Sequence, residues 1–301
     1  MTGLSRMPGR LSLRAAAFAA ALTAAAAFSP ALAEETTVRP GEAFTFSAGM
    51  DFTSHFISFG NDTWGGGHKS SPFNEDSTIF IYGTVNAKIT DELSASLNIW
   101  SDNNNNAEDT LGSHIQEIDV NAGLTYKFDE GSPLAGLTVG VAHTHWIFSG
   151  ETENAIELSA SYDDKGKYKD WAGADFALNP SALLHYRYDV IGGQEDDVAV
   201  LQVGVKPTFS YTFDGAKDYP ISIAVPANVA FFLGDYQGGD NGFGYANIGV
   251  VGTVPLAFIP AQYGAWTASA SLTYWHTDDD AIPANPEDDF FVTALSVGVA
   301  F

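Results

Sequence analysis

Two kinds of residue in this chain have the chemistry of a metal site. His143 and His145 are one residue apart, so in a β-strand both imidazoles lie on one face, and imidazole is a common metal ligand. They continue the apolar face of Leu137, Val139 and Val141, so we expect them to be polar aromatics at a membrane interface instead. The acidic runs 195–197, 278–280 and 287–289 offer carboxylates that suit Ca²⁺, but no EF-hand or nonapeptide spacing accompanies them. We therefore expect solvated acidic loops, with no metal site and no cofactor.

The composition narrows the function classes. The 301 residues include 37 Asp and Glu against 13 Lys and Arg, for a net charge of −24, and no cysteine. A nucleic-acid partner needs a basic face, so this charge argues against one. Without cysteine, disulfide scaffolds, thiolate-ligated zinc and thiol catalysis are excluded.

The first 33 residues have the pattern of a secretory signal peptide. Arg6, Arg10 and Arg14 precede an Ala-rich apolar stretch, and Ala31-Leu32-Ala33 forms an A-x-A cleavage site. We predict that residues 1–33 are cleaved and that residues 34–301 form one domain in the envelope of a Gram-negative cell. No later apolar run reaches the roughly 18 residues of a membrane-spanning helix.

The sequence predicts that β-strands position any functional site in this chain. Apolar and polar residues alternate over segments of about ten residues, which is the strand pattern. Twelve such segments are present: 44–56, 78–89, 93–101, 117–128, 137–148, 156–162, 182–190, 201–213, 221–233, 245–254, 266–276 and 291–301. Pro207 and Pro226 fall inside two of them, where each needs a bulge or a strand end. Because residues 163–180 are long enough to contain another hairpin, ten or fourteen strands stay open beside twelve.

The polar faces favour a closed antiparallel transmembrane β-barrel over a soluble β-sandwich. They consist mainly of Ser, Thr, Asn, Gly and Tyr, which suits a wet lumen, and longer acidic connections alternate with shorter ones. Strand parity then predicts the residues that line the lumen: Asp51, Lys88, Glu117, Asp119, Lys127, Glu157, His185, Arg187, Asp189 and Lys206. Twelve strands lie between barrels that side chains fill and barrels with an open channel.

The alternating residues that finish with Phe301 resemble the terminal strand of outer-membrane barrels, so we expect the barrel-assembly machinery to recognise this strand. The chain also resembles the TorF-type family of outer-membrane porins. The resemblance rests on Met50-Asp51-Phe52-Thr53-Ser54-His55-Phe56, on residues 179–189, and on the closing strand. It implies a porin-like barrel in the cell outer membrane, in contact with lipid and lipopolysaccharide, and it implies no catalytic residue.

An enzyme is the less favoured alternative. Outer-membrane phospholipases also have about twelve strands, and Ser70-Ser71-Pro72-Phe73 is faintly similar to one of their segments. Their His-x-Ser-Asn-Gly motif is missing, and a nucleophilic serine needs a base within hydrogen-bond reach. We expect neither catalytic residues nor a lipid-modifying activity.

The expected function is passive diffusion of small solutes with a preference for cations. Acidic residues are concentrated in the longer connections, where we place Asp62, Asp102 and Glu153 among others, and carboxylates around a pore mouth favour cations. The outer-mouth set is Asp196, Asp197, Asp278, Asp279, Asp280, Asp288 and Asp289. The alternative is a non-conducting barrel with a structural or adhesive role, because opposed lumen charges can also pair and close the lumen.

Overall fold

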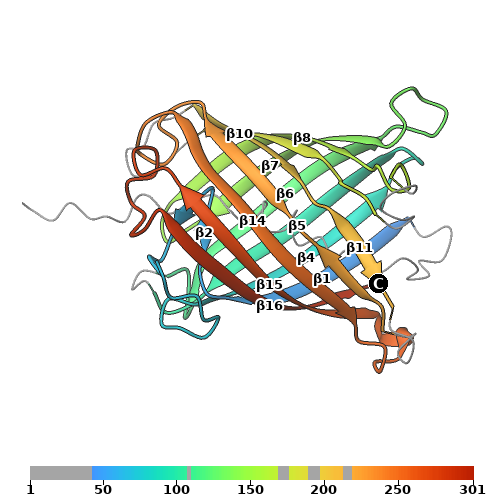
Figure 1. Ribbon diagram of the computed structural model, residues 1–301, viewed down its shortest axis with the longest axis horizontal. Coiled ribbons are helices and arrows are strands. Elements are labelled where there is room, and N and C mark those ends of the chain that lie inside the picture. Colours follow the sequence, from blue (N-terminus) through green and yellow to red (C-terminus); the bar gives the residue numbers. More distant parts are fainter. Residues whose placement is uncertain (1–42, 107–109, 169–175, 189–196, 213–218) are drawn as a thin grey trace, which may run out of the picture.

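The chain folds into a closed antiparallel β-barrel of twelve strands (Figure 1). The computed structural model describes residues 43–106, 110–168, 176–188, 197–212 and 219–301. The predicted signal peptide, 1–33, lies outside the described residues, as do Asp189 and Asp196. No helix of the described residues is long and apolar enough to cross a membrane.

Ten of the wall strands are continuous. The first seven are β1 (Phe44–Thr53), β4 (Thr78–Lys88), β5 (Leu93–Asn103), β6 (Ile115–Lys127), β7 (Leu137–Ile147), β8 (Thr152–Tyr162) and β9 (Ser181–Tyr188). The last three are β14 (Gly242–Pro255), β15 (Ala265–Thr277) and β16 (Asp289–Ala300). Consecutive wall strands pair with each other, and the pairing of β1 with β16 closes the barrel.

Two further wall strands are each broken in two at the prolines that the sequence singled out. The first consists of β10 (Val198–Val205) and β11 (Thr208–Tyr211), separated at Pro207. The second consists of β12 (Ile221–Ala224) and β13 (Ala227–Phe232), separated at Pro226. Proline lacks the N–H that a ladder needs, which explains both breaks. Counting each broken pair as one strand gives twelve, so the predicted fold class and strand number are confirmed.

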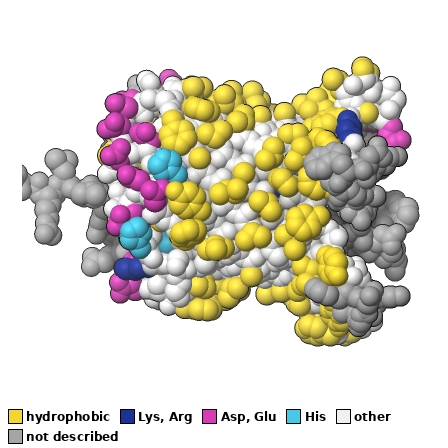
Figure 2. Space-filling model, in the orientation of Figure 1, with side chains coloured by type: hydrophobic (Ala, Val, Ile, Leu, Met, Phe, Trp, Pro, Cys, Tyr) yellow, Lys and Arg dark blue, Asp and Glu magenta, His cyan; other side chains and the backbone are white. Residues whose placement is uncertain are grey.

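The outer wall of the barrel is apolar. In strand after strand the outward residues are exposed and hydrophobic, including Met50, Ile81, Leu124, Val141, Leu158 and Leu201. Yellow side chains are spread over the middle of the visible face in Figure 2, and most of the acidic side chains gather at one end. A hydrophobic belt on a closed barrel, in which every strand is paired, is the requirement for β-structure in lipid.

The two ends of the barrel differ. We call one the turn end, where Phe44, Phe301 and the connections 89–92, 128–136 and 256–264 lie. We call the other the loop end, where the described connections include 54–77, 148–151, 233–241 and 278–288. In Figure 1 the turn end is on the right, near the label C, and the loop end is on the left, near β2.

Candidate functional site

The lumen is the candidate site, and the structure brings six of the predicted lumen residues together inside it. All six are at most 5% exposed and lie on the inward face: Asp51, Glu117, Asp119, Glu157, His185 and Arg187. Lys88 and Lys127 also have inward parity but lie exposed at the turn end, where Lys88 Nζ is 2.5 Å from Asp91 Oδ1. Lys206 is half-buried beside the break at Pro207.

The predicted outer-mouth residues that the structure describes, which leave out Asp196, lie at the loop end. Asp197 accepts a hydrogen bond of 2.5 Å from the Tyr186 hydroxyl. Asp289 accepts one of 2.5 Å from the Tyr274 hydroxyl and lies 2.9 Å from His276 Nδ1. Ligand atoms of Asp278, Asp279 and Asp280 lie within 4.8 Å of one another, but these side chains are largely exposed, and exposed acidic groups commonly occur without an ion. Asp288 is exposed as well.

The histidine pair points away from the lumen. His143 Nε2 lies 2.8 Å from the Tyr188 hydroxyl, and His145 Nδ1 lies 2.9 Å from Asn154 Oδ1. Their cross-strand partners on β8 are Ile156 and Asn154, and neither offers a carboxylate. Tyrosine and histidine here form a polar aromatic edge on the outer wall, near the loop end.

Two acidic residues that we expected in the outer loops lie inside the barrel. Asp102 and Glu153 are completely buried, because β5 runs on to Asn103 and β8 begins at Thr152. The sequence pattern ended β5 at Ser101 and began β8 at Ile156. Continued alternation was the available signal, since Asp102 lies two residues from Trp100 and Glu153 lies four residues from Glu157.

These additions make one side of the lumen wall strongly acidic. The wall carries Asp102 on β5, Glu117 and Asp119 on β6, and Glu153 and Glu157 on β8. Asp102 and Glu117 are direct cross-strand partners. Oε1 of Glu117 and both carboxylate oxygens of Asp119 make no hydrogen bond of normal geometry with described residues.

The basic groups of this wall come from β9. His185 Nδ1 lies 2.9 Å from Glu157 Oε1, its cross-strand partner. The guanidinium of Arg187 stacks over the ring of Tyr236 at 4.2 Å and donates a hydrogen bond of 2.6 Å to the Tyr236 carbonyl. Arg187 is thus the one Arg or Lys among the described residues that is completely buried, against five buried carboxylates on the same side.

The connection after β1 does not extend outward as an acidic loop, which is how we read it from the sequence. Its first part, residues 54–64, folds into the lumen and contains the short strands β2 (Ile57–Ser58) and β3 (Asn61–Asp62). We call residues 54–64 the plug hairpin. Phe56, Phe59 and Asp62 in it are each at most 3% exposed. The predicted outer-loop position of Asp62 is therefore wrong.

The tip of the plug hairpin has an unusual backbone. Phe59 and Gly60 have φ values of 43° and 86°, as a two-residue hairpin turn of type I′ requires. Positive φ is uncommon for a bulky residue such as Phe and costs on the order of 1–3 kcal/mol. At Gly60 a Cβ atom would lie 2.7 Å from Ile282 and Tyr245, so glycine is needed for space as well.

Packing of the Phe59 ring compensates for this strain. The ring centroid lies 4.5 Å from that of His185 and 5.3 Å from that of Tyr236. Around them lies a buried apolar cluster that fills this half of the lumen, consisting of Phe59, Trp146, Phe148, Ala155, Val198, Val200, Ala230, Phe232, Tyr236, Tyr245, Ala281 and Ile282. The plug hairpin thus completes a hydrophobic core inside the barrel.

Two loop-end connections hold the plug hairpin through its backbone. Gln237 Nε2 donates a hydrogen bond of 2.7 Å to the carbonyl of Ser58. Asn285 donates to the carbonyl of Gly60 at 2.9 Å and accepts from the N–H of Asp62 at 2.7 Å. One amide side chain therefore binds both strands of the hairpin.

The base of the plug hairpin is attached to the opposite wall. Trp64 Nε1 donates a hydrogen bond of 3.0 Å to Asp102 Oδ2. Phe56 packs against Phe80 and Trp100, with ring centroids 5.4 Å and 5.5 Å away. The hairpin therefore bridges the lumen from the apolar cluster to β4 and β5.

The turn-end half of the lumen is different. Apart from Lys88 and Lys127, many of its inward residues are small and stay at least partly exposed, among them Thr84, Ser94, Ser96, Asn98, Thr125, Ser159, Ser161 and Ser269. Among the described residues, the plug hairpin and bulky side chains therefore occupy the lumen at the loop end, whereas smaller polar side chains line it at the turn end.

No protein-family model matches the chain, and no curated protein matches it. Several solved structures have a similar barrel. The NanC porin is 14% identical over 86% of this chain and 99% of its own, with a TM-score of 0.45. An outer-membrane channel from Pseudomonas putida F1 is 12% identical over 88% and 100%, with a TM-score of 0.43. LpxR from Salmonella typhimurium is 7% identical over 85% and 99%, with a TM-score of 0.44.

Proposed function

We propose that this protein is a porin-like barrel of the cell outer membrane that lets small solutes diffuse, and that the plug hairpin controls the passage. The observation that carries the proposal is that the plug hairpin, and not only the barrel wall, occupies the lumen. Among the described residues, a connecting segment between two strands occupies the loop-end half of the lumen, whereas small polar side chains line the turn-end half. A segment held by a few side chains can leave the lumen without unfolding the barrel wall.

The exposed apolar belt supports a place in lipid, and the acidic loop end supports an outward orientation of that end. Long extracellular loops and short periplasmic turns are typical of outer-membrane barrels. The chain would reach this membrane by the predicted signal peptide and the barrel-assembly machinery, with lipid and lipopolysaccharide around it. No lipid-modifying activity is part of the proposal.

A preference for cations is the finer part of the proposal. Once the plug hairpin moves, a solute passes the acidic loop end and then the wall that carries Glu117, Asp119 and Glu157. Rings of carboxylates raise the local concentration of cations and favour their passage.

The second candidate is a non-conducting barrel with a structural or adhesive role. The buried apolar cluster around Phe59 favours it, because this cluster resembles the core of a stable protein more than a loosely held gate.

Single-channel recording in planar bilayers separates the two candidates. A porin with a movable plug gives rare openings in the native protein and frequent openings when residues 56–63 are replaced by a short Gly-Ser linker. A folded barrel that stays silent in both forms would contradict the proposed passage and favour the structural role.

A further inference from the structure

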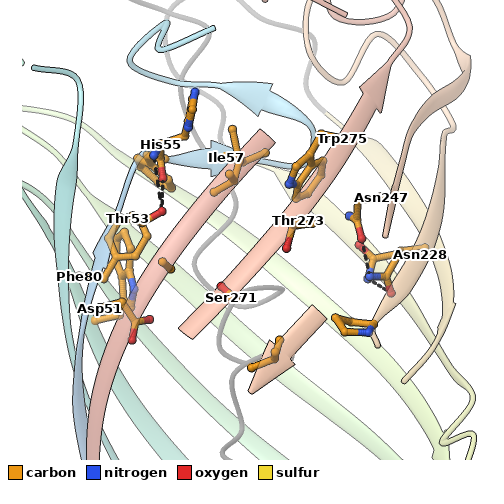
Figure 3. A pocket seen from close by; sticks show the side chains of 17 residues that line it. Asp51, Thr53, His55, Ile57, Phe80, Asn228, Asn247, Ser271, Thr273 and Trp275 are labelled. Atoms are coloured by element: carbon orange, nitrogen blue, oxygen red, sulfur yellow. Dashed lines mark hydrogen bonds between the residues drawn. The ribbon is translucent and has the colours of Figure 1, made fainter. Parts of the chain in front are cut away.

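A cavity of about 110 Å³ lies in the lumen directly against the plug hairpin (Figure 3). His55, Phe56 and Ile57 of the hairpin form one boundary of it. By the measure in which a water takes about 10–15 Å³, the cavity has room for roughly seven to eleven water-sized groups. That is the size range of a small polyol or a single sugar ring.

One side of the cavity is a row of amide groups. The Tyr245 hydroxyl donates a hydrogen bond of 2.6 Å to Gln202 Oε1, and Asn228 Nδ2 donates one of 3.0 Å to Asn247 Oδ1. Gln202 Nε2 lies 3.5 Å from Asn228 Oδ1 and connects the two pairs. Each amide carries two N–H donors and two acceptor lone pairs, so these bonds hold the groups in place and leave further donors and acceptors available.

The other side offers hydroxyl groups and a single carboxylate. In Figure 3, Ser271 and Thr273 lie along one strand between Asp51 on one side and the Asn228–Asn247 pair on the other. The Tyr82 hydroxyl donates a hydrogen bond of 3.2 Å to Asp51 Oδ1, and a carboxylate can accept several such bonds. The indole of Trp275 supplies an apolar face above these polar groups, and Phe80, Trp100 and Val292 add further apolar surface.

The charge of the lining excludes several solutes. The described residues that line the cavity include the carboxylate of Asp51 and no Lys or Arg, so no permanent positive charge among them balances an anionic solute. A cation would find only the carboxylate of Asp51, which already accepts a hydrogen bond from the Tyr82 hydroxyl. The other polar groups of the lining are mainly neutral amides and hydroxyls, so they favour a cation only weakly. A neutral polyhydroxy solute matches the set best, because each of its hydroxyls both donates and accepts, and its C–H face can cover the indole.

We infer that this cavity binds a small neutral polyol or monosaccharide, with Asn228, Asn247, Gln202 and Asp51 as hydrogen-bonding groups and Trp275 as the apolar face. The inference deepens the proposed passage function, on which it rests, by naming its solute class. Because the plug hairpin forms part of the cavity, such a solute also contacts the element that closes the lumen.

The test is a titration of the full-length protein in detergent, followed by tryptophan fluorescence and by calorimetry. The probes are D-glucose and myo-inositol as neutral polyols, D-glucuronate as an anion and choline as a cation. We expect saturable binding of at least one neutral polyol, at least tenfold weaker binding of glucuronate and choline, and at least tenfold weaker polyol binding in Asn247→Ala and Trp275→Phe. The matched control is Asn98→Ala, which removes an inward amide of β5 that does not line the cavity.

Three results would overturn the inference: no saturable polyol binding to protein with the gel mobility of a folded barrel, tighter binding of choline or glucuronate, or equal effects of Asn98→Ala and Asn247→Ala. The two proposals fail separately. Polyol binding to a barrel that never conducts contradicts the passage function alone, and conduction without polyol binding contradicts the inference alone.

Discussion

The ring of Phe59 lies 4.5 Å from the ring of His185, a residue 126 positions further along the chain on the opposite side of the lumen. Phe59 reaches it from a turn with positive φ, so its backbone is strained while its side chain is almost fully buried. This contact is where the plug hairpin meets the barrel wall, and it is the first place to test whether the hairpin moves.

Removing the Phe59 ring should open the lumen more often. Truncation of a buried Phe to Ala costs about 3–5 kcal/mol, which is far more than the strain relieved at the turn. We expect Phe59→Ala to raise the open probability in planar bilayers by at least tenfold while the folded barrel keeps its heat-modifiable mobility on gels. Phe73→Ala is the control, because Phe73 lies in the same connection with 73% of its surface exposed. Equal open probability in the native protein and Phe59→Ala would count against a movable plug.

Loss of the Asn285 amide should loosen the plug hairpin locally. Asn285→Ala removes one hydrogen bond to Gly60 and one from Asp62. Each bond contributes about 0.5–1.5 kcal/mol, so hydrogen exchange of the Asp62 amide should become roughly fivefold or more faster. Exchange in β1 and β16 should stay unchanged, and Asn98→Ala should leave the hairpin unaffected. If the Asp62 amide stays as protected as in the native protein, Asn285 does not hold the hairpin.

Acid should strengthen docking of the plug hairpin through Asp62. Burial raises the pKa of the Asp62 carboxyl above its ordinary value of 3.8, against the opposing effect of His55, whose Nε2 lies 3.8 Å away. The docked hairpin therefore holds a proton more readily than a released one. This contribution to docking is complete below pH 3.8 and is lost as the pH rises through the raised pKa of the docked state.

Open probability should accordingly be lower at acidic pH than at neutral pH, and the Asp62→Asn change should remove part of this dependence. Asp76 is the other charged group near Asp62, so Asp76→Asn serves as the comparison. Because the native protein and Asp62→Asn differ at this one residue, the difference between their pH curves is the informative quantity. Superimposable pH curves for the two would exclude Asp62 as the group responsible.

The acidic loop end should make an open barrel prefer K⁺ over Cl⁻. We expect a cation-selective reversal potential under a KCl gradient, decreasing at high salt because screening shortens the reach of surface charge to about 8 Å or less at and above physiological ionic strength. Replacing Asp278, Asp279, Asp280, Glu287, Asp288 and Asp289 by their amides should reduce it. Asp129→Asn with Glu130→Gln, at the turn end, is the control pair. Anion selectivity, or no change in the sixfold variant, would defeat the charge argument.

A charge at the last residue should impair assembly. The backbone of Phe301 exchanges two hydrogen bonds with Phe46, of 2.8 Å and 3.2 Å, and its ring is exposed on the outer wall. Phe301→Asp should lower the amount of heat-modifiable barrel in the outer membrane, whereas Phe301→Tyr should not. Phe258→Asp places the same charge in an exposed turn at the same end and should be tolerated. Unchanged membrane levels of Phe301→Asp would contradict the assembly role.

The strands were predictable from local pattern because the alternation of side chains has a period of two. A residue two positions from Trp100 must share its face whatever the rest of the chain does, so the twelve strands and the inward direction of Glu117, Asp119 and His185 follow from the sequence. The prolines at 207 and 226 likewise marked the breaks through the donor that each one lacks.

No two-residue alternation predicted the position of the plug hairpin. Residues 54–64 combine a turn and polar residues with the apolar Phe56, Ile57, Phe59 and Trp64, which indicate some burial but not where the segment lies. Their position depends on His185, Tyr236, Gln237 and Asn285, which the barrel brings together from more than 120 residues away. The same holds for Asp102 and Glu153, whose burial depends on that hairpin and cluster. The alternation of side chains along a strand is a property of the local backbone, so it can be predicted from the sequence. The packing of the plug hairpin in the lumen depends on residues that come together only when the barrel closes, so the tertiary structure decides it.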